Sequence, residues 1–285
     1  MTYDVGRFGA FQRQDRATLA LAAALEEAGY GALWVGGSPG GDLAGIEVLL
    51  AATSRLVVAT GIVNIWKDAA DQIAGSALRL SDRYPDRFLL GIGVSHPEST
   101  GERYAHPYPA LVAYLDALDE AGVGADRRAL AALGPRVLAL AGARTAAAHP
   151  YLVPVEHTRR ARELLGGGVL LAPEHKAVLD PDPERARALA RPAVVTPYLS
   201  LVNYTSNLRR LGYTDDDLAD GGSDRLIDDL VATGDPARVA ALLRGHLDAG
   251  ADHVAVHLLV PPGDDLTTAL VDGYRRLAPE LGLPE

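Results

Sequence analysis

The chain has 285 residues, of which 48% are hydrophobic and 22% are charged, and its formal net charge at pH 7 is -10. This composition supports a large hydrophobic core and argues against a disordered chain. The acidic balance argues against general binding to nucleic acids or to anionic membranes. The chain has no cysteine, which excludes disulfides, thiol catalysis and cysteine-ligated metals.

No apolar run reaches the roughly 18 residues that a membrane-spanning helix requires. The N-terminus begins Met1-Thr2-Tyr3-Asp4 and lacks the basic start and the apolar core of a signal peptide. We therefore expect a soluble, cytoplasmic protein that acts on a small-molecule substrate and binds neither membranes nor nucleic acids.

Short apolar runs alternate with helical patterns along the chain. In chain order, the predicted strands cover residues 5–11, 32–36, 56–64, 88–94, 136–141, 151–155, 169–172 and 253–260. The predicted helices cover residues 16–28, 43–52, 70–84, 110–121, 126–133, 158–165 and 266–277. Repeated strand-then-helix units predict a parallel sheet with helices outside it. Eight such units predict an α/β fold of the (β/α)8 TIM-barrel type.

The spacing between the last two predicted strands is unusually long. About 80 residues lie there, against roughly 30 for a standard βαβ unit. Helical patterns fill this length at residues 183–190, 199–211, 224–232 and 236–249. We expect one domain over residues 1–285, with a helical insertion between strands 7 and 8 at about residues 174–232 that caps the barrel mouth.

Two predicted strand ends carry residues suited to chemistry, which in such a barrel takes place at the C-terminal ends of the strands. The first, at residues 59–64, ends in Asn64, whose amide can both donate and accept hydrogen bonds. The second, at residues 90–96, ends in His96, whose imidazole can give or take a proton near neutral pH. The alternatives are a turn residue that caps the next helix for Asn64, and an ordinary loop histidine before Pro97 for His96.

A candidate anion site follows the predicted strand at residues 136–141. Gly142, Ala143 and Arg144 would open a helix there, and free N–H groups at a helix start favour a phosphate. The guanidinium of Arg144 matches phosphate geometry. A simple strand-to-helix turn is the alternative.

Other polar residues near the predicted mouth carry weaker signals. His149 is interpreted as a buried structural histidine and Lys176 as a solvated charge, with ligand contact as the alternative for each. His253 and His257 share a strand face, but no third or fourth ligand is evident, so no metal site is expected. The glycines at residues 91 and 93 lack the third glycine of a dinucleotide-binding fingerprint.

Four stretches in the expected order carry a family resemblance. They are GYGALWV at residues 29–35, VATGI at 58–62, FLLGIGVSH at 88–96, and LVATGDP at 230–236 with AGADHV at 249–254. Together they resemble the bacterial luciferase-like superfamily, and specifically its coenzyme F420-dependent oxidoreductase branch. The resemblance implies a barrel with an insertion after strand 7, and F420 or flavin mononucleotide (FMN) at the mouth. It also implies a homodimer and no metal.

The resemblance implies roles for several residues. Gly61 and Ile62 align with a bulge whose non-proline cis peptide supports the deazaflavin ring, against the alternative of an ordinary strand with a glycine bend. Val94 would contact the cofactor, whose phosphate would lie near Gly142. Gly36, followed by a second glycine, stands where several F420 enzymes carry an acidic residue and a histidine. This departure argues against a sugar-phosphate dehydrogenase, although the glycines would leave backbone room for the ring.

These observations lead to three hypotheses. The first is an F420-dependent oxidoreductase that transfers hydride between the deazaflavin and a small organic substrate, with His96 as the catalytic residue that exchanges the proton. The second keeps the fold and changes the chemistry to an FMN-dependent monooxygenase. The third is a flavin- or F420-binding protein without turnover.

Overall fold

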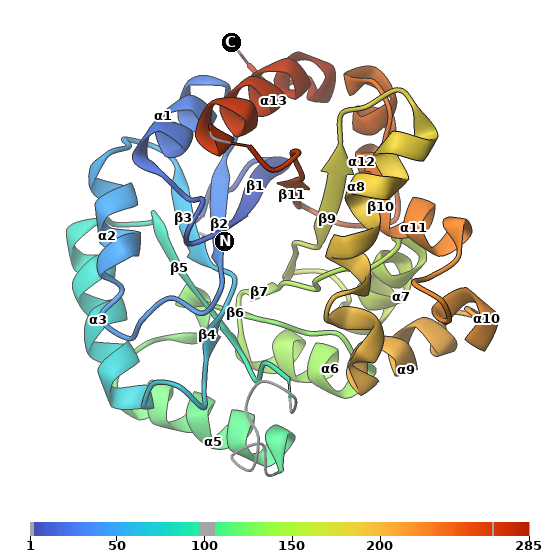
Figure 1. Ribbon diagram of the computed structural model, residues 1–285. Helices are drawn as coiled ribbons and strands as arrows, with labels where there is room; N and C mark the ends of the chain where they lie inside the picture. Colours follow the sequence, from blue (N-terminus) through green and yellow to red (C-terminus); the bar gives the residue numbers. More distant parts are fainter. Residues whose placement is uncertain (1–2, 97–105, 264, 285) are drawn as a thin grey trace.

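The computed structural model describes residues 3–96, 106–263 and 265–284. In this part of the chain a parallel sheet curls around a central axis and helices surround it (Figure 1). The strands are β1 (Phe8–Arg13), β2 (Ala32–Gly36), β3 (Val57–Thr60), β4 (Val63–Asn64), β5 (Phe88–Gly93), β6 (Arg128–Leu130), β7 (Ala147–Ala148), β8 (Leu170–Leu171), β9 (Glu174–Val178), β10 (Val231–Thr233) and β11 (Val254–Leu258).

The helices follow the strands in the manner of a (β/α) barrel. They are α1 (Leu19–Glu27), α2 (Ala44–Ala51), α3 (Ala70–Arg83), α5 (Pro107–Glu120), α6 (Pro135–Arg144), α7 (Val155–Leu165), α8 (Pro183–Val195), α9 (Val202–Arg210), α10 (Asp215–Leu218), α11 (Asp224–Leu230), α12 (Pro236–Asp248) and α13 (Leu266–Leu281). The 3₁₀ turns η2 (Ala125–Arg127) and η3 (Tyr198–Ser200) also lie in the described part of the chain.

The sheet order is β10-β9-β11-β1-β2-β3-β5-β6-β7-β8, with β4 paired to β5. The backbone around Pro173 closes the barrel, because it bonds to β7 on one side and to β11 on the other. The N–H of Ala172 donates to the carbonyl of Ala148 at 2.9 Å, and the N–H of Ala255 donates to the carbonyl of Pro173 at 2.9 Å. β8 and β9 therefore act as one seventh barrel strand, and the predicted TIM-barrel fold is confirmed.

Side chains alternate between two hydrophobic layers because successive residues of a strand point to opposite faces. In β2, Leu33 and Val35 pack outward against the helices, whereas Trp34 points into the barrel. The inner layer is built mainly from alanines around Trp34 and Phe11. All five residues of β2 are buried, as expected for a parallel strand covered on both faces.

Capping aspartates and prolines determine where two of the predicted helices begin. The side chain of Asp182 caps α8 and that of Asp235 caps α12, each by accepting from a backbone N–H three residues on. A proline follows each cap, where its fixed φ suits the first helical position. The predictions for residues 32–36, 70–84 and 88–94 agree with β2, α3 and β5 to within one residue at each end.

The predictions between residues 126 and 155 are wrong. The predicted helix at 126–133 contains β6, and the predicted strand at 136–141 lies inside α6. The predicted strand at 151–155 is not one; the strand is β7, four residues earlier. An apolar run such as that of α6 fits a buried strand or a buried helix equally well, and the starting Gly134-Pro135 was the signal that favoured the helix.

The helical segment after strand 7 begins later than expected. β9 continues the barrel strand through residues 174–178, so the extra helices α8 to α11 occupy residues 183–230. They lie together on one side of the barrel (Figure 1) and form a hydrophobic cluster of their own, which includes Val194, Leu208 and Ile227. β10 then adds a short strand beside β9. Searched over the described residues, no helix is both long enough and apolar enough to cross a membrane.

Candidate functional site

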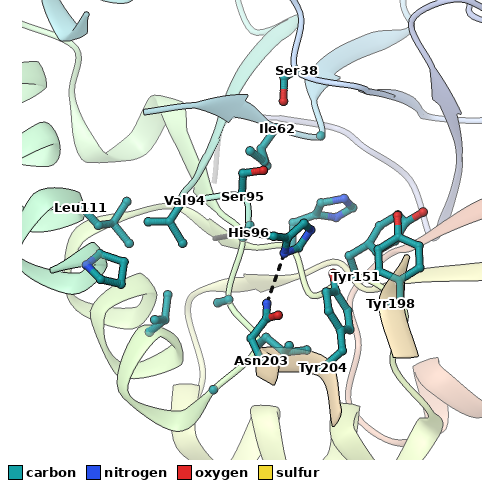
Figure 2. A pocket seen from close by; sticks show the side chains of 18 of the residues that line it. Ser38, Ile62, Val94, Ser95, His96, Leu111, Tyr151, Tyr198, Asn203 and Tyr204 are labelled. Atoms are coloured by element: carbon teal, nitrogen blue, oxygen red, sulfur yellow. Dashed lines mark hydrogen bonds between the residues drawn. The ribbon is translucent and has the colours of Figure 1, made fainter. Parts of the chain in front are cut away.

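A cavity of about 580 Å³ opens at the C-terminal ends of the barrel strands (Figure 2). The strand ends contribute residues from β1, from the loops after β2, β5, β6 and β7, and from the segment between β3 and β4. η3 and α9 cover the other side. The lining residues are Phe11, Arg13, Gly37, Ser38, Gly61, Ile62, Val94, Ser95, His96, Pro107, Tyr108, Leu111, Ala131, Ala132, Leu133, Gly134, Val137, His149, Tyr151, Tyr198, Asn203, Tyr204, Ser206 and Arg210.

The charged side chains found in the described cavity lining are positive. Among the described residues, the cavity is lined by the guanidinium groups of Arg13 and Arg210 and by no carboxylate. Outside the lining, the carboxylate of Asp15 pairs with Arg13, at 3.3 Å. The cavity therefore favours a ligand with an anionic group.

The segment between β3 and β4 forms the bulge that the resemblance implies, and the peptide bond between Gly61 and Ile62 is cis. Thr60 fastens it to β5, because its hydroxyl donates to the carbonyl of Gly91 and accepts from the N–H of Gly91, both at 2.8 Å. A Cβ on Gly91 would lie 1.8 Å from the Thr60 carbonyl oxygen, and one on Gly93 would lie 2.9 Å from the Ile62 side chain. These two glycines therefore make room for the bulge itself.

His149 presents a single acceptor to this bulge. Its Nδ1 lies 2.7 Å from the carbonyl oxygen of Ala172, which can only accept, so Nδ1 carries the proton. Nε2 is then a lone-pair acceptor, and it is buried without a partner in the part of the chain that the structure describes. It lies 3.5 Å from the position that a Cβ on Gly61 would take. Burial lowers the pKa of His149 to about 4, so the ring is neutral at neutral pH.

His96 lies at the centre of the cavity, between the end of β5 and α9 (Figure 2). Its Nδ1 is 3.4 Å from the amide nitrogen Nδ2 of Asn203. The ring meets Tyr198 edge-on, with centroids 6.3 Å apart, and Tyr204 at a tilt, with centroids 5.5 Å apart. The asparagine and both tyrosines come from the extra helical segment, so this segment forms part of the surroundings of His96.

Four polar side chains form a buried cluster beneath the cavity. Glu174 accepts from Lys176 Nζ and lies against His257 Nδ1, both at 2.9 Å, and Lys176 Nζ also donates to the hydroxyl of Tyr151 at 2.9 Å. Burial alone would raise the pKa of Glu174, but the Lys176 ammonium and His257 hold that pKa well below its usual range. Lys176 is 1% exposed, so the interpretation of a solvated charge is wrong.

The structure brings His96, Gly61, Ile62 and Val94 to the cavity, as the sequence analysis expected. Gly36 lies just below the lining, where a Cβ would meet the ring of Phe11 at 2.5 Å. Its immediate neighbours in the chain, residues 37 and 38, line the cavity in its place.

Asn64 and Trp66 stabilise the loop after β4 and are absent from the described lining. The side-chain oxygen of Asn64 accepts from the N–H of Trp66 at 3.0 Å, which is the turn role given as its alternative. The indole N–H of Trp66 donates to the carbonyl of Val94 at 2.9 Å and so ties this loop to the end of β5.

The placement expected for Gly142, Ala143 and Arg144 is wrong. They form the last turn of α6, where carbonyls rather than free N–H groups point outward. Arg144 bonds to Asp116 at 2.8 Å and to Asp119 at 2.6 Å, both on α5. The other end of α6, at Gly134, is the one that reaches the cavity.

The histidine that directly precedes β11 and the histidine within β11 have structural partners. His253 Nδ1 lies 2.8 Å from the Gly6 carbonyl oxygen, so its Nε2 accepts from the Trp34 indole at 3.1 Å. Over the described residues, no group of three or more histidine, aspartate or glutamate side chains could hold a metal ion.

Sequence reasoning missed Asn203, Tyr198 and Tyr204 as site residues. They lie in the extra helical segment, more than 100 residues after His96, and no motif near them indicated that they reach the strand ends. Tyr151 was missed because the strand before it was misplaced.

Comparisons with known proteins agree with this geometry. Residues 8–126 match the family model of luciferase-like monooxygenases. This match, over less than half of the chain, agrees with the luciferase-like resemblance found in the sequence. No curated protein sequence matches the chain.

Solved structures of similar fold include two F420-dependent enzymes and one structure in complex with FMN. An F420-dependent secondary alcohol dehydrogenase in complex with an F420–acetone adduct has a TM-score of 0.73 at 14% identity, covering 96% of this chain and 98% of that one. The F420-dependent tetrahydromethanopterin reductase of Methanopyrus kandleri has a TM-score of 0.71 at 15% identity, covering 96% and 99%. The FMN-bound oxygenating constituent of 3,6-diketocamphane monooxygenase from Pseudomonas putida has a TM-score of 0.69 at 14% identity, covering 98% and 99%. At these identities the likeness concerns the fold.

Proposed function

We propose that this protein is a coenzyme F420-dependent oxidoreductase that transfers hydride between the deazaflavin and a small organic substrate. The observation that carries the proposal is the buried, unpartnered Nε2 of His149 beside the bulge at Gly61, in a cavity that also contains His96. A buried acceptor without a partner is costly, and a ligand that brings an N–H donor relieves that cost.

The residues present fit a deazaflavin. Its pyrimidine ring carries an N–H between two carbonyls, which suits the single acceptor of His149. Arg13 and Arg210 supply positive charge for the phosphate in the side chain of the cofactor. The cavity, at about 580 Å³, lies in the range typical of small-molecule and cofactor sites.

The chain's own residues place the reactants and handle the proton. The bulge at Gly61 and Ile62 and the acceptor of His149 would hold the ring, and η3 and α9 would cover the substrate and exclude water. When bound, the deazaflavin supplies the two-electron hydride chemistry. His96 gives or takes the accompanying proton, because its imidazole lies in the cavity and an imidazole can act as a general acid or base.

An FMN-dependent monooxygenase is the second candidate. The description of the matching family and the FMN-containing structural neighbour favour it. The acceptor of His149 suits the pyrimidine edge of FMN equally well, so the two cofactors differ here in chemistry rather than in fit.

Turnover assays separate these functions. The purified protein is incubated with oxidised F420 and a panel of small alcohols, or with reduced F420 and the corresponding ketones and aldehydes, while the absorbance of the cofactor is followed. We expect substrate-dependent change in the wild type and loss of it in His96→Ala. The exposed His106 at the start of α5 provides the matched control His106→Ala, which keeps its activity.

Substrate-coupled oxygen consumption with reduced FMN and none with F420 would replace the proposal by the monooxygenase. Cofactor binding without turnover, unaffected by His96→Ala, would leave a non-catalytic binding protein.

A further inference from the structure

Two tyrosines that line the cavity lie against the buried pair of Glu174 and Lys176. Tyr151 follows β7, and Tyr198 lies in η3, within the extra helical segment. Their ring centroids are 5.4 Å apart, with an angle of 42° between the planes (Figure 2). Lys176 Nζ lies 4.1 Å from the ring centroid of Tyr151 and 5.5 Å from that of Tyr198. The buried charge pair is therefore close to both tyrosines.

Lys176 determines the direction of the hydrogen bond at Tyr151. Its Nζ lies 2.9 Å from the hydroxyl oxygen of Tyr151 and 2.9 Å from Oε1 of Glu174. Burial lowers the pKa of Lys176, but the Glu174 carboxylate opposes this effect and favours the ammonium form. An ammonium group has hydrogens and no lone pair, so it can only donate, and the oxygen of Tyr151 accepts. The hydrogen of the Tyr151 hydroxyl must therefore point away from Lys176.

The hydroxyl of Tyr198 receives this hydrogen. Burial raises the pKa of both tyrosines, so both hydroxyls keep their hydrogens at neutral pH. The hydrogen bond between the two hydroxyls raises the pKa of Tyr151 further and lowers that of Tyr198. A hydrogen bond makes its donor harder to ionise and its acceptor easier to ionise. Tyr151 is therefore the donor, as its bond with Lys176 requires.

One hydrogen of the pair remains for a ligand. Two hydroxyls bring two hydrogens, and the bond between Tyr151 and Tyr198 uses one of them. The hydrogen of Tyr198 has no acceptor among the residues that the structure describes. The ring of Tyr198 meets that of His96 edge-on, with centroids 6.3 Å apart, and both residues line the cavity. A ligand oxygen in the cavity beside Tyr198 would therefore complete the hydrogen bonds of the pair.

We propose that Lys176 and Tyr151 position the hydroxyl of Tyr198 as the hydrogen-bond donor to an oxygen atom of the substrate. Each member of this chain donates to the next one, from Lys176 to Tyr151, from Tyr151 to Tyr198, and from Tyr198 to the substrate. The inference rests on the proposed function for the identity of the ligand as substrate, and on the structure alone for the direction of the chain.

This donor determines the substrate class. A ketone or an aldehyde gains negative charge on its oxygen when hydride reaches the carbon, and a fixed donor stabilises that charge. The same donor binds the oxygen of an alcohol in the reverse direction. The hydroxyl of Tyr198 therefore favours alcohols, ketones and aldehydes over compounds that have no oxygen on the reacting carbon.

Neutron diffraction tests the direction of the chain and needs neither cofactor nor substrate. Crystals of the wild-type protein are exchanged into heavy water, and the deuterium atoms of the hydroxyls are located. We expect the deuterium of Tyr151 between the two hydroxyl oxygens and the deuterium of Tyr198 directed into the cavity. A deuterium of Tyr198 that points to the oxygen of Tyr151 would overturn the proposal, as would a neutral Lys176 amine that accepts from Tyr151.

Removal of single hydroxyls tests the role of the chain in turnover. Tyr198→Phe keeps the ring beside His96, and we expect kcat/KM for ketone reduction with reduced F420 to fall roughly tenfold at unchanged F420 affinity. Tyr151→Phe acts through Tyr198, so it should lower kcat/KM by less, and its neutron map should show no single direction for the Tyr198 deuterium. Tyr213→Phe is the matched control that keeps its activity, because it removes a hydroxyl that bonds to Asp229 at 2.7 Å, outside the described cavity lining.

The two experiments keep this inference apart from the proposed function. If no compound of the panel reacts with F420, the proposed function fails, while the neutron map still decides the direction of the hydrogen-bond chain. If the wild type and Tyr198→Phe reduce ketones with equal kcat/KM, the proposed function stands and the role of Tyr198 is overturned.

Discussion

The indole of Trp34 and the imidazole of His149 lie parallel inside the barrel, with ring centroids 4.0 Å apart and an angle of 6° between their planes. The stack fixes the plane of His149, and the bond from its Nδ1 to the Ala172 carbonyl fixes the tautomer. Both constraints leave Nε2 as an acceptor at the cavity. A ring that is held in this way loses little freedom when a ligand binds to it.

Replacement of His149 tests whether this acceptor binds the cofactor. His149→Leu keeps an apolar side chain against Trp34 and removes the acceptor, so we expect F420 affinity to fall roughly tenfold, the equivalent of about one hydrogen bond. The measurement is a fluorescence titration of the cofactor.

His246→Leu is the matched control for this variant. His246 is another fully buried histidine, bonded to Thr158 at 2.7 Å and absent from the described cavity lining. It should cost stability without changing affinity. Unchanged affinity in His149→Leu would remove His149 from the binding site.

The glycine of the bulge is required by packing. A Cβ on Gly61 would lie 2.9 Å from the ring of Phe11, so Gly61→Ala forces Phe11 or the backbone to move. We expect a loss of about 1–3 kcal/mol in the free energy of unfolding, measured with urea, and partial recovery in the double variant with Phe11→Leu.

Gly142→Ala gives the opposite result. Its Cβ would meet only Leu165 at 3.6 Å, an ordinary contact, and the residue lies within α6. We expect a gain of roughly 0.5–1 kcal/mol and unchanged cofactor affinity, because alanine favours a helix and this end of α6 lies away from the cavity. Weakened binding in Gly142→Ala would restore the phosphate site that the sequence suggested.

The buried pair of Glu174 and Lys176 makes stability depend on both partners. Lys176→Met leaves the Glu174 carboxylate buried without its cationic partner, with His257 and the N–H of Leu152 beside it, so we expect a loss of about 3–5 kcal/mol. The double variant Glu174→Gln with Lys176→Met removes both charges and should be much closer to the wild type. Urea unfolding measures the free energy of unfolding of the single and double variants. Equal stability of these two variants would contradict the dependence on both partners.

Buried histidines predict a loss of stability in mild acid. Burial lowers the pKa of His149, His175 and His253 from 6.5 to about 4. The unfolded chain therefore binds protons at these sites below pH 6.5, whereas the folded chain resists them until about pH 4. Their contribution is complete above pH 6.5 and declines as the pH falls from 6.5 to 4, by as much as about 3 kcal/mol for each histidine.

Urea unfolding between pH 7.5 and 5 measures this decline in a range above the ordinary pKa of carboxylates. The triple replacement of these histidines by apolar residues should make the decline smaller, and the part that remains comes from His157, His246 and His257, whose pKa values burial also lowers. A wild-type curve that is already flat in this range would contradict the assignment of three neutral, buried rings.

The outward layer of the barrel was predictable because its signal is local. The apolar run of β2 and the 3.6-residue periodicity of α3 each identify an element within their own sequence. β6, β7 and β10 have two or three residues each, too few for a periodic pattern. β9 was not recognised as a buried strand because Glu174 and Lys176 make its sequence polar. The two charges neutralise each other only in the folded protein.

The same limit applies to the site, in which the sequence predicted only residues near strand ends. His96 and the bulge at Gly61 follow strand ends and carry a family resemblance. Asn203 and Tyr204 reach His96 only through the arrangement of α9 over the barrel, and the sequence around them indicates no more than a helix.

Equilibrium binding of the two cofactors tests the central claim most directly. The purified protein is titrated into F420 and, separately, into FMN, and the fluorescence of each cofactor is followed. The account predicts micromolar or tighter binding of F420, at least as tight as that of FMN, and weaker F420 binding in His149→Leu. Tight FMN binding with weak F420 binding, or binding of neither cofactor, would contradict it.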